Sequence, residues 1–460
     1  MYFRSFFDER LAHMSYFVGC QRTGDAIVID PARNIEPYLQ IAQREGFEIV
    51  GTAETHIHAD YLSGAKELAH RTEAKLYLSD EGDKDWKYVY AKDYPHELLK
   101  DGSTFMVGNI HFKVVHTPGH TPESISFLLT DEGGGAKAPM GVFTGDFLFV
   151  GDVGRPDLLE KAAGVMGTSQ AGAKQMFASL QKVEDLPDYL QVWPAHGAGS
   201  ACGKSLGAVP MSTLGYEKQF NWAFQIKDEE KFVKALLEGQ PEPPKYFAQM
   251  KKLNKLGPDL LKNEETPQTS LPVPNHTDLV DTRTAKDFAA GHVKGSINIP
   301  FNQSFVNWAG WLLRYDRDIV LIAPKEEVPE IKIALQSIGL DRITGYIPIE
   351  ELGTDLESYQ NVSVREAKEL IDDKDYFVVD VRNQSEWDAG HIPEAYHYML
   401  GNLTDHLDSL PKDKKIITQC QGGGRSAIGA SLLQAKGFTV LNLEGGFSAW
   451  EKAGMPVKKE

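Results

Sequence analysis

Four short motifs in the first half of the chain carry histidine and aspartate at positions suited to metal binding. They are THIHADY (55–61), PGHT (118–121), TGD (144–146) and PAHG (194–197). Each ends or follows a run of β-type residues, and the carboxyl ends of strands in α/β layers are where ligands usually bind. Imidazole and carboxylate groups from separate strand ends can therefore converge on one rim, and we expect a metal site there.

A cysteine suited to nucleophilic chemistry lies near the other end of the chain. Cys420 opens the sequence CQGGGRS (420–426), between an apolar run and a helical pattern. Three consecutive glycines allow a loop whose backbone N–H groups cradle an anion, and a helix N-terminus lowers the pKa of a thiol. We expect Cys420 to attack a sulfane sulfur, with Arg425 binding an anionic donor or acceptor such as thiosulfate or sulfite. The remaining cradle residues are Gln421, Gly422, Gly423, Gly424 and Ser426.

The elements that must position the metal motifs alternate between strand and helix. AIVID (26–30) and MGVFTGD (140–146) have the composition of strands, while IEPYLQIAQREG (35–46) has helical periodicity. Two proline-rich stretches, 238–245 and 265–276, then flank a short helical segment. Proline removes amide donors and restricts φ, so we expect a linker with a short helix at this point.

The rest of the chain contains an internal repeat. Residues 278–300 match residues 377–399 in the frame Val-Asp-x-Arg followed by Gly-His, and each copy continues to a second apolar strand and a helix. The second copy begins with a predicted capping box, Ser363 and Glu366. We therefore expect two α/β domains of similar size. The predicted divisions of the whole chain are 1–237, the linker 238–275, 276–356 and 357–460.

The ordered motifs H-x-H-x-D, His, Asp and His resemble the metallo-β-lactamase fold family over about residues 1–230. This resemblance implies an αββα sandwich. Hydrolases of the family such as glyoxalase II hold two metals and carry a histidine where this chain has Tyr61. Neutral tyrosine is a poor ligand because its pKa is about 10. The second site would then keep only Asp60, His196 and a shared Asp146, with His58 nominally serving the first. Two imidazoles and one carboxylate are the set that non-haem Fe(II) oxygenases use, and His56, His120 and Asp146 supply such a set.

Persulfide dioxygenases form a branch of this fold family, and the first domain is similar to them, including in the run TGDFLFVGDVGRPD (144–157). The similarity implies one Fe(II) per chain, held by His56, His120 and Asp146. It also implies that Arg155 contacts the anionic group of a thiol carrier. The carrier stays open among glutathione, coenzyme A and bacillithiol, because Ala198 stands where glutathione-using members have tyrosine. The other motif residues would be vestigial or would orient the ligands: His58, Asp60, Tyr61 and His196.

The C-terminal copy resembles the rhodanese sulfurtransferase family over about residues 358–457, through Cys-x₄-Arg-Ser and the preceding VVDVRNQSEWDAGHIPEA (378–395). The resemblance implies a parallel-sheet domain in which Asp380 and Arg382 support the fold. In the middle copy Ala323 stands where the C-terminal copy has its cysteine, and an acidic segment replaces the glycine-rich loop. We therefore expect the middle domain to be catalytically inactive.

Composition excludes several other classes of protein. A net charge of −17 argues against nucleic acid or an anionic membrane as the main partner, and no apolar run is long enough to span a bilayer. Three cysteines in 460 residues fit a reducing, cytoplasmic location. Of the two outside the rhodanese loop, we expect Cys20 to be a buried core residue. For Cys202, six residues after His196, a redox thiol near the iron and a loop cysteine without a role both stay open.

Together these features predict an α/β multidomain enzyme: a metallo-β-lactamase αββα sandwich followed by two rhodanese-like α/β domains with parallel sheets. The resemblance implies a persulfide dioxygenase that converts a low-molecular-weight thiol persulfide and O₂ to sulfite. It also implies a sulfurtransferase that interconverts persulfide plus sulfite with thiosulfate plus thiol. We expect a homo-oligomer. The alternatives are a dinuclear thioester hydrolase of glyoxalase II type and a sulfur-relay or sensor protein.

Overall fold

The structure is a computed structural model that describes residues 1–158, 160, 167–204, 206–240, 242–262, 264–372 and 375–459. The chain forms two compact units, each of which is described by itself. The first comprises Met1–Asn263 with Gln336–Gly339, and the second comprises Glu264–Leu335 with Leu340–Glu460.

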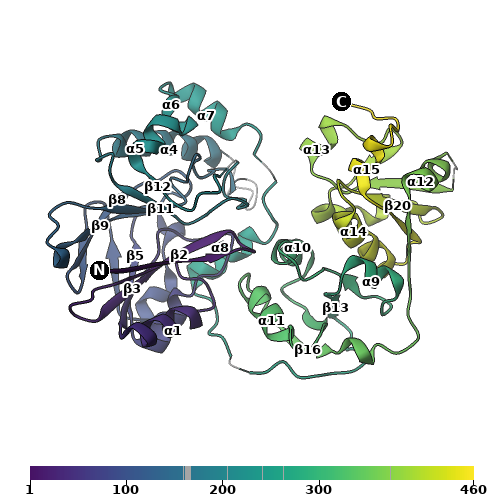
Figure 1. The fold of residues 1–460 in the computed structure, drawn as a ribbon, viewed down its shortest axis with the longest axis horizontal. Helices are drawn as coiled ribbons and strands as arrows, with labels where there is room; N and C mark the ends of the chain where they lie inside the picture. The colour runs from purple at the N-terminus through teal and green to yellow at the C-terminus, as the bar shows by residue number, and fades with distance from the viewer. Residues whose placement is uncertain are drawn as a thin grey trace. The chain divides into compact units, whose positions relative to one another are not determined.

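Two six-stranded sheets lie face to face in the first unit (Figure 1). The first sheet has the order β1 (Tyr2–Asp8), β2 (His13–Gly19), β3 (Asp25–Ile29), β4 (Glu48–Ala53), β5 (Lys75–Ser79) and β6 (His96–Leu99). The second has the order β12 (Ser212–Thr213), β11 (Gln191–Pro194), β10 (Gly141–Gly145), β9 (Ile125–Asp131), β8 (Ile110–His116) and β7 (Thr104–Val107). Apolar and aromatic residues of both sheets, among them Ile27, Phe112, Phe143 and Trp193, form one buried cluster between them.

Helices cover the outer face of each sheet. Among the described residues, the α-helices of the first unit are α1 (Glu36–Glu45), α2 (Ala65–Thr72), α4 (Thr168–Glu184), α5 (Leu214–Phe220), α6 (Trp222–Gln225), α7 (Glu229–Leu237) and α8 (Phe247–Leu256). Tyr38 and Ile41 of α1 pack with residues of β2 and β3, and Met176 of α4 packs with Leu128 and Val142 of the second sheet. Figure 1 shows α1 on one side of the sheets and α4–α7 on the other. The four layers confirm the predicted αββα sandwich.

The segment predicted as a linker holds α8, and the first unit continues beyond it to Asn263. Proline content suggests a spacer, but the apolar face of α8 buries Phe247 and Met250. Lys251 on the same helix lies 3.6 Å above the ring of Trp86. This helix is therefore part of the packed first unit.

The second unit contains two parallel sheets, which confirms the predicted rhodanese-like architecture. The first copy consists of β13 (Thr277–Asp281), α9 (Ala285–Ala290), β14 (Ile297–Asn298), α10 (Phe305–Leu312), β15 (Asp318–Ile322), α11 (Val328–Gln336) and β16 (Ile343–Ile347). The second consists of β17 (Gln360–Val362), α12 (Val364–Ile371), β18 (Tyr376–Asp380), α13 (Gln384–Ala389), β19 (Ala395–His397), β20 (Lys415–Gln419), α14 (Gly424–Ala435), β21 (Val440–Leu443) and α15 (Gly446–Lys452). The strand orders are β14-β13-β15-β16 and β17-β21-β20-β18-β19.

The two copies of the sequence repeat make the same side-chain contacts. Arg283 bonds the carboxylate of Asp281 and the carbonyl oxygen of Gly291, and Arg382 does the same with Asp380 and Gly390. The capping box at the start of α12 is also present. Within this unit the hydroxyl of Ser431 on α14 accepts the backbone N–H of Asn298 at 3.0 Å, so the two copies pack against each other.

Candidate functional site

The metal motifs lie where strands of the two sheets end. His56 follows β4, and His120, Asp146 and His196 follow β8, β10 and β11 of the second sheet. All four side chains are buried. The fold thus places these residues, far apart in sequence, at one rim of the sandwich, as the sequence predicts.

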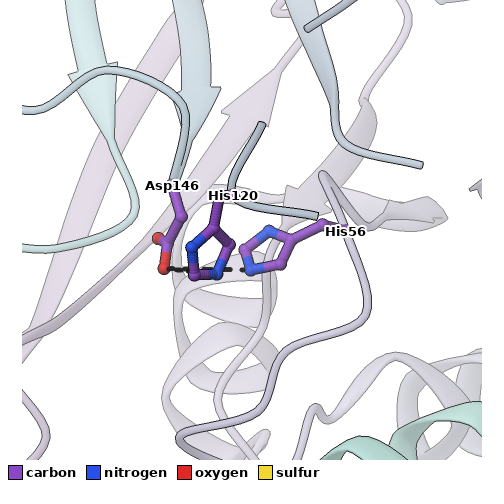
Figure 2. A group of neighbouring side chains, drawn as sticks. All are labelled: His56, His120 and Asp146. Carbon is purple, nitrogen blue, oxygen red and sulfur yellow. Dashed lines mark ion pairs between the residues drawn. The ribbon is translucent and has the colours of Figure 1, made fainter. Parts of the chain in front are cut away.

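His56, His120 and Asp146 form a compact group (Figure 2) whose potential ligand atoms lie within 4.8 Å of one another. Oδ2 of Asp146 is 3.8 Å from Nε2 of His56 and 3.4 Å from Nε2 of His120. Neither carboxylate oxygen of Asp146, nor Nε2 of His56, has a hydrogen-bond partner among the described residues. Buried polar atoms normally have partners, so these unpartnered atoms of Asp146 and His56 suit a cation.

Hydrogen bonds hold both imidazoles in the form that a metal requires. The hydroxyl of Thr55 donates to Asp30, so it accepts Nδ1–H of His56 at 3.0 Å. Nδ1–H of His120 donates to the backbone oxygen of Arg155 at 2.9 Å. Burial lowers the pKa of His56 well below its usual range and also lowers that of His120. Both rings are therefore neutral with Nε2 unprotonated, and the three residues fit a metal ion.

A second buried group lies beside the first and consists of Asp60, His196 and Cys202. Nε2 of His196 is 3.0 Å from Asp60 Oδ2 and 3.4 Å from Asp146 Oδ1. Burial, together with the neighbouring carboxylates, raises the pKa of the Cys202 thiol. The sequence left open whether Cys202 is a redox thiol or a loop cysteine without a role. Its side chain is buried beside the candidate metal site, where the neutral thiol is favoured.

Tyr61, which occupies the position of a family ligand, is turned away from a ligand role. Its hydroxyl donates to the backbone oxygen of Asp30 at 3.3 Å, and its ring lies against that of His13 at 3.9 Å between centroids. Burial raises the pKa of Tyr61 well above its usual value, so the phenol is neutral. His13, on β2, was missed because it lies in no motif and reaches this region only through strand pairing.

His58 also lies outside the group of three. Its Nε2 is 3.1 Å from Oδ1 of Asp30 and 3.1 Å from Oε2 of Glu54, and both acids are buried. Neither Asp30 nor Glu54 was predicted from the sequence to lie at the site.

Asn254 of α8 anchors the loop that carries these histidines. Its side-chain amide donates to the backbone oxygens of His58 and Tyr61, at 2.8 and 2.7 Å, and its oxygen accepts the N–H of Ser63. Asn254 is almost 200 residues from this loop in sequence, and no local signal pointed to it.

Arg155 is placed differently from the prediction that it contacts an anionic substrate group. Its guanidinium is fully buried and bonds both carboxylate oxygens of Asp157 at 2.7 Å. A buried bidentate pair leaves the guanidinium engaged inside the protein, so substrate contact would require the pair to open. In this structure Arg155 instead contributes its backbone oxygen to the positioning of His120.

Glu123 carries a pH-dependent prediction. Its carboxyl is fully buried and accepts the backbone N–H of Ile57 at 2.7 Å, and burial raises its pKa to about 7. The folded state therefore binds the proton more tightly than the unfolded state, so stability falls as the pH rises from about 4.3 through 7. Glu123→Gln keeps the acceptor without the charge. At pH 8 we expect its free energy of unfolding to exceed that of the native protein by about 3 kcal/mol or less, and at pH 4 we expect the two to be equal. Calorimetry at both pH values is the measurement, and an equal difference at both would contradict this account.

The cysteine loop lies between β20 and α14. Cys420 directly follows β20, and its Sγ accepts the N–H of Gly423 at 3.1 Å. Gly423 has a φ of +97°, a left-handed conformation that favours glycine. A Cβ at Gly422 or Gly424 would meet no atom within 4 Å, so the outer side of the loop is open to a ligand.

Two predicted cradle residues are engaged within the protein. Ser426 is fully buried and its hydroxyl donates to the backbone oxygen of Gly423 at 3.1 Å. Gln421 donates to Ser448 and accepts from Arg382. These hydrogen bonds stabilise the conformation of the loop that follows Cys420. Gly446 was missed: a Cβ there would lie 2.1 Å from the backbone oxygen of Cys420, so only glycine fits beside the loop.

Arg425 is paired with Glu386 of α13. Both terminal guanidinium nitrogens donate to the two carboxylate oxygens at 2.6 Å, and the pair is partly exposed. Glu386, which was missed in the sequence, also completes a capping box with Asn383. Arg425 was predicted to bind an anionic substrate, and the carboxylate of Glu386 competes with such an anion for the guanidinium.

Glu386→Gln tests that competition. Glutamine keeps the capping box and removes the negative charge, so we expect the KM for thiosulfate to fall about two- to fivefold with a smaller change in kcat. Steady-state transfer of sulfur from thiosulfate to cyanide is the measurement, with Glu369→Gln on the exposed face of α12 as the matched control. A rise in KM would show instead that Glu386 holds Arg425 in its binding position.

The middle copy has no thiol at the corresponding position. Ala323 follows β15 as Cys420 follows β20, and its N–H bonds to Ile347 of the neighbouring strand. The structure therefore agrees with the sequence repeat, which places alanine at the nucleophile position.

In the described part of the chain, no helix combines the length and apolar character needed to cross a bilayer.

Comparison with known proteins supports the two architectures. Residues 8–196 match the metallo-beta-lactamase superfamily, and residues 263–342 and 363–453 match the rhodanese-like domain. The crystal structure of a metallo-beta-lactamase from Staphylococcus aureus is 48% identical, with a TM-score of 0.70, and covers 76% of this chain and 99% of its own.

Two curated relatives match different parts of the chain. The putative sulfurtransferase YtwF of Bacillus subtilis is 35% identical over 98 residues, which are 21% of this chain and 95% of YtwF. A beta-lactamase hydrolase-like protein of Xylella fastidiosa is 27% identical over 297 residues, which are 58% of this chain. The match spans 63% of the length of the Xylella protein.

Proposed function

The chain belongs to the metallo-beta-lactamase superfamily and carries rhodanese-like domains, and we propose from this that it couples a persulfide dioxygenase to a thiosulfate sulfurtransferase. The observation that carries the proposal is the buried group of His56, His120 and Asp146. Two neutral imidazoles and one carboxylate are the ligand set of mononuclear Fe(II) oxygenases. The side chains of His58 and Tyr61, which would enlarge the set, bond elsewhere.

In the proposed first reaction, RSSH, O₂ and H₂O give RSH and sulfite with its two protons. When bound, Fe(II) supplies the redox chemistry that lets a persulfide react with dioxygen. The protein holds the two ligand imidazoles through Thr55 and the backbone of Arg155, so their Nε2 atoms stay unprotonated. Burial of the group limits access of water to the reacting sulfur.

In the proposed second reaction, the Cys420 thiolate attacks the outer sulfur of RSSH, and RS⁻ leaves with a Cys420 persulfide remaining. Sulfite then attacks the terminal sulfur of that persulfide, which forms thiosulfate and returns the thiolate. The N–H of Gly423, already bonded to Sγ, stabilises the negative charge on sulfur. Arg425 lies five residues further along the chain, on the first turn of α14, at a position suited to an anionic acceptor.

A dinuclear hydrolase is the second candidate, because Asp60, His196 and Cys202 form a further buried group beside the first. A second ion bound there would allow the hydrolytic chemistry that the name of the Xylella relative implies.

One experiment separates these functions. The metal content of the full chain is determined, and oxygen uptake and sulfite formation are then followed with a low-molecular-weight persulfide. We expect about one iron per chain with sulfite formed in proportion to the oxygen consumed. Two metals per chain with thioester hydrolysis and no oxygen uptake would replace the proposal with the hydrolase. Persulfide loading of Cys420 without oxygen uptake would favour a sulfur relay.

A further inference from the structure

His58 lies beside the candidate ligand group of His56, His120 and Asp146 but does not join it. It is two residues from His56 in sequence, and the two rings are 4.1 Å apart between centroids. An imidazole at that distance could add a further ligand to the group by a change of side-chain rotamer. Something in the structure must therefore hold it away.

Two buried acids hold the ring of His58. Nε2 lies 3.1 Å from both Asp30 Oδ1 and Glu54 Oε2, and each acid is at most 2% exposed. The contact with Asp30 is a hydrogen bond and the contact with Glu54 is an ion pair. Both involve a charged carboxylate, and a buried carboxylate is costly without a charged or hydrogen-bonding partner. Rotation of His58 toward the metal group would break both contacts and leave two buried carboxylates facing each other.

Each acid is itself fixed by other contacts. Asp30 accepts the N–H of Thr55 at 2.7 Å and the hydroxyl of Thr55 at 2.9 Å, and its φ of +50° is unusual for a residue other than glycine. Glu54 accepts the hydroxyl of Ser63 through its other oxygen. The backbone oxygen of His58 is held by Asn254. Backbone and ring of His58 are thus constrained independently.

We propose that Glu54 is a positioning residue which, with Asp30, keeps the imidazole of His58 out of the metal ligand set. The inference rests on the proposed metal centre and explains why His58 does not join His56 and His120 beside Oδ2 of Asp146. By this means a side chain that lies two positions before His56 determines how many coordination positions stay open for substrate.

Cobalt(II) binding to the metal-free full chain tests the proposal through the absorption spectrum, which reports the number and type of ligands. Four proteins are compared: native, Glu54→Gln, His58→Gln and the double variant. Glutamine at position 54 keeps the volume and the bond with Ser63 but removes the charge opposite His58. Glutamine at position 58 keeps an amide donor toward the two acids but removes the imidazole.

We expect native protein and His58→Gln to share one spectrum and one dissociation constant. Glu54→Gln should change the spectrum and bind cobalt about tenfold more tightly, because His58 is released toward the metal. The double variant should return to the native spectrum, since no imidazole remains to be released. Ser63→Ala, which removes the other partner of Glu54, is the matched control and should keep the native spectrum.

Three results would overturn the inference: a native spectrum in Glu54→Gln, a change that persists in the double variant, or loss of cobalt binding in His58→Gln. If Glu54→Gln fails to fold, Glu54→Ala takes its place in the same cycle, and unfolding of both would show that Glu54 is mainly structural. A native chain that binds cobalt but consumes no oxygen after iron loading would count against the proposed function alone. A native chain that binds no cobalt would overturn both.

Discussion

Asp146→Ala is expected to abolish oxygen uptake while sulfur transfer from thiosulfate continues. Asp146 is the only carboxylate in the candidate group with His56 and His120, so its loss leaves two ligands for the metal. We expect iron content and oxygen uptake to fall by more than about 100-fold. Neither oxygen of Asp146 has a hydrogen-bond partner among the described residues, so alanine breaks no such bond and the fold should persist.

The measurement for Asp146→Ala combines iron analysis, an oxygen electrode and the thiosulfate assay on one preparation. Asp188→Ala is the matched control, because the side chain of this aspartate is 75% exposed and its ion pair is with Lys218, outside the candidate group. Full iron content in Asp146→Ala would show that the metal lies elsewhere, with the group of Asp60, His196 and Cys202 as the next place to examine.

Cys420→Ser is expected to have the converse effect. A serine hydroxyl is not ionised near neutral pH and cannot form a persulfide, so sulfur transfer from thiosulfate should fall by more than about 1,000-fold. Oxygen uptake should stay within about twofold, because Cys420 belongs to the second unit and the candidate metal residues belong to the first.

Mass spectrometry of the protein after incubation with thiosulfate provides a second measurement for Cys420→Ser. The native chain should gain one sulfur atom and the variant none. Cys20→Ser is the control, since its thiol lies in the core of the first unit. A sulfur atom retained in Cys420→Ser would move the sulfurtransferase site to another cysteine. If either Asp146→Ala or Cys420→Ser abolished both activities in folded protein, the assignment of two separate centres would be wrong.

Much of the fold was predictable because local patterns carry it. The strand predicted at 140–146 is β10, Gly141–Gly145, and the helix predicted at 35–46 is α1, Glu36–Glu45. The repeat of Val-Asp-x-Arg correctly predicted two copies of one architecture, since the same residues form the same ion pair in each. The segment 238–275 was predicted as a linker, but its helix α8 belongs to the first unit. Proline content does not indicate where the apolar face of a helix will pack.

For the site, residue types and their order along the chain were sufficient to predict which groups meet. His56, His120 and Asp146 follow strand ends, and strands of a layered sandwich end at a common rim. Cys420 was predictable for a similar reason, because a strand, a glycine-rich loop and a helix are consecutive in sequence.

Only the tertiary structure decided how each of these side chains is used. Asp30 and Glu54 contact the ring of His58, and Asn254 donates a hydrogen bond to its backbone oxygen. The guanidinium of Arg155 is bonded to Asp157, and that of Arg425 to Glu386. Some of these partners are adjacent in sequence, yet their bonds depend on which side chains burial brings within about 3 Å. That choice follows from the packing of the whole unit, because a buried charge must find its partner among all the groups that folding places around it.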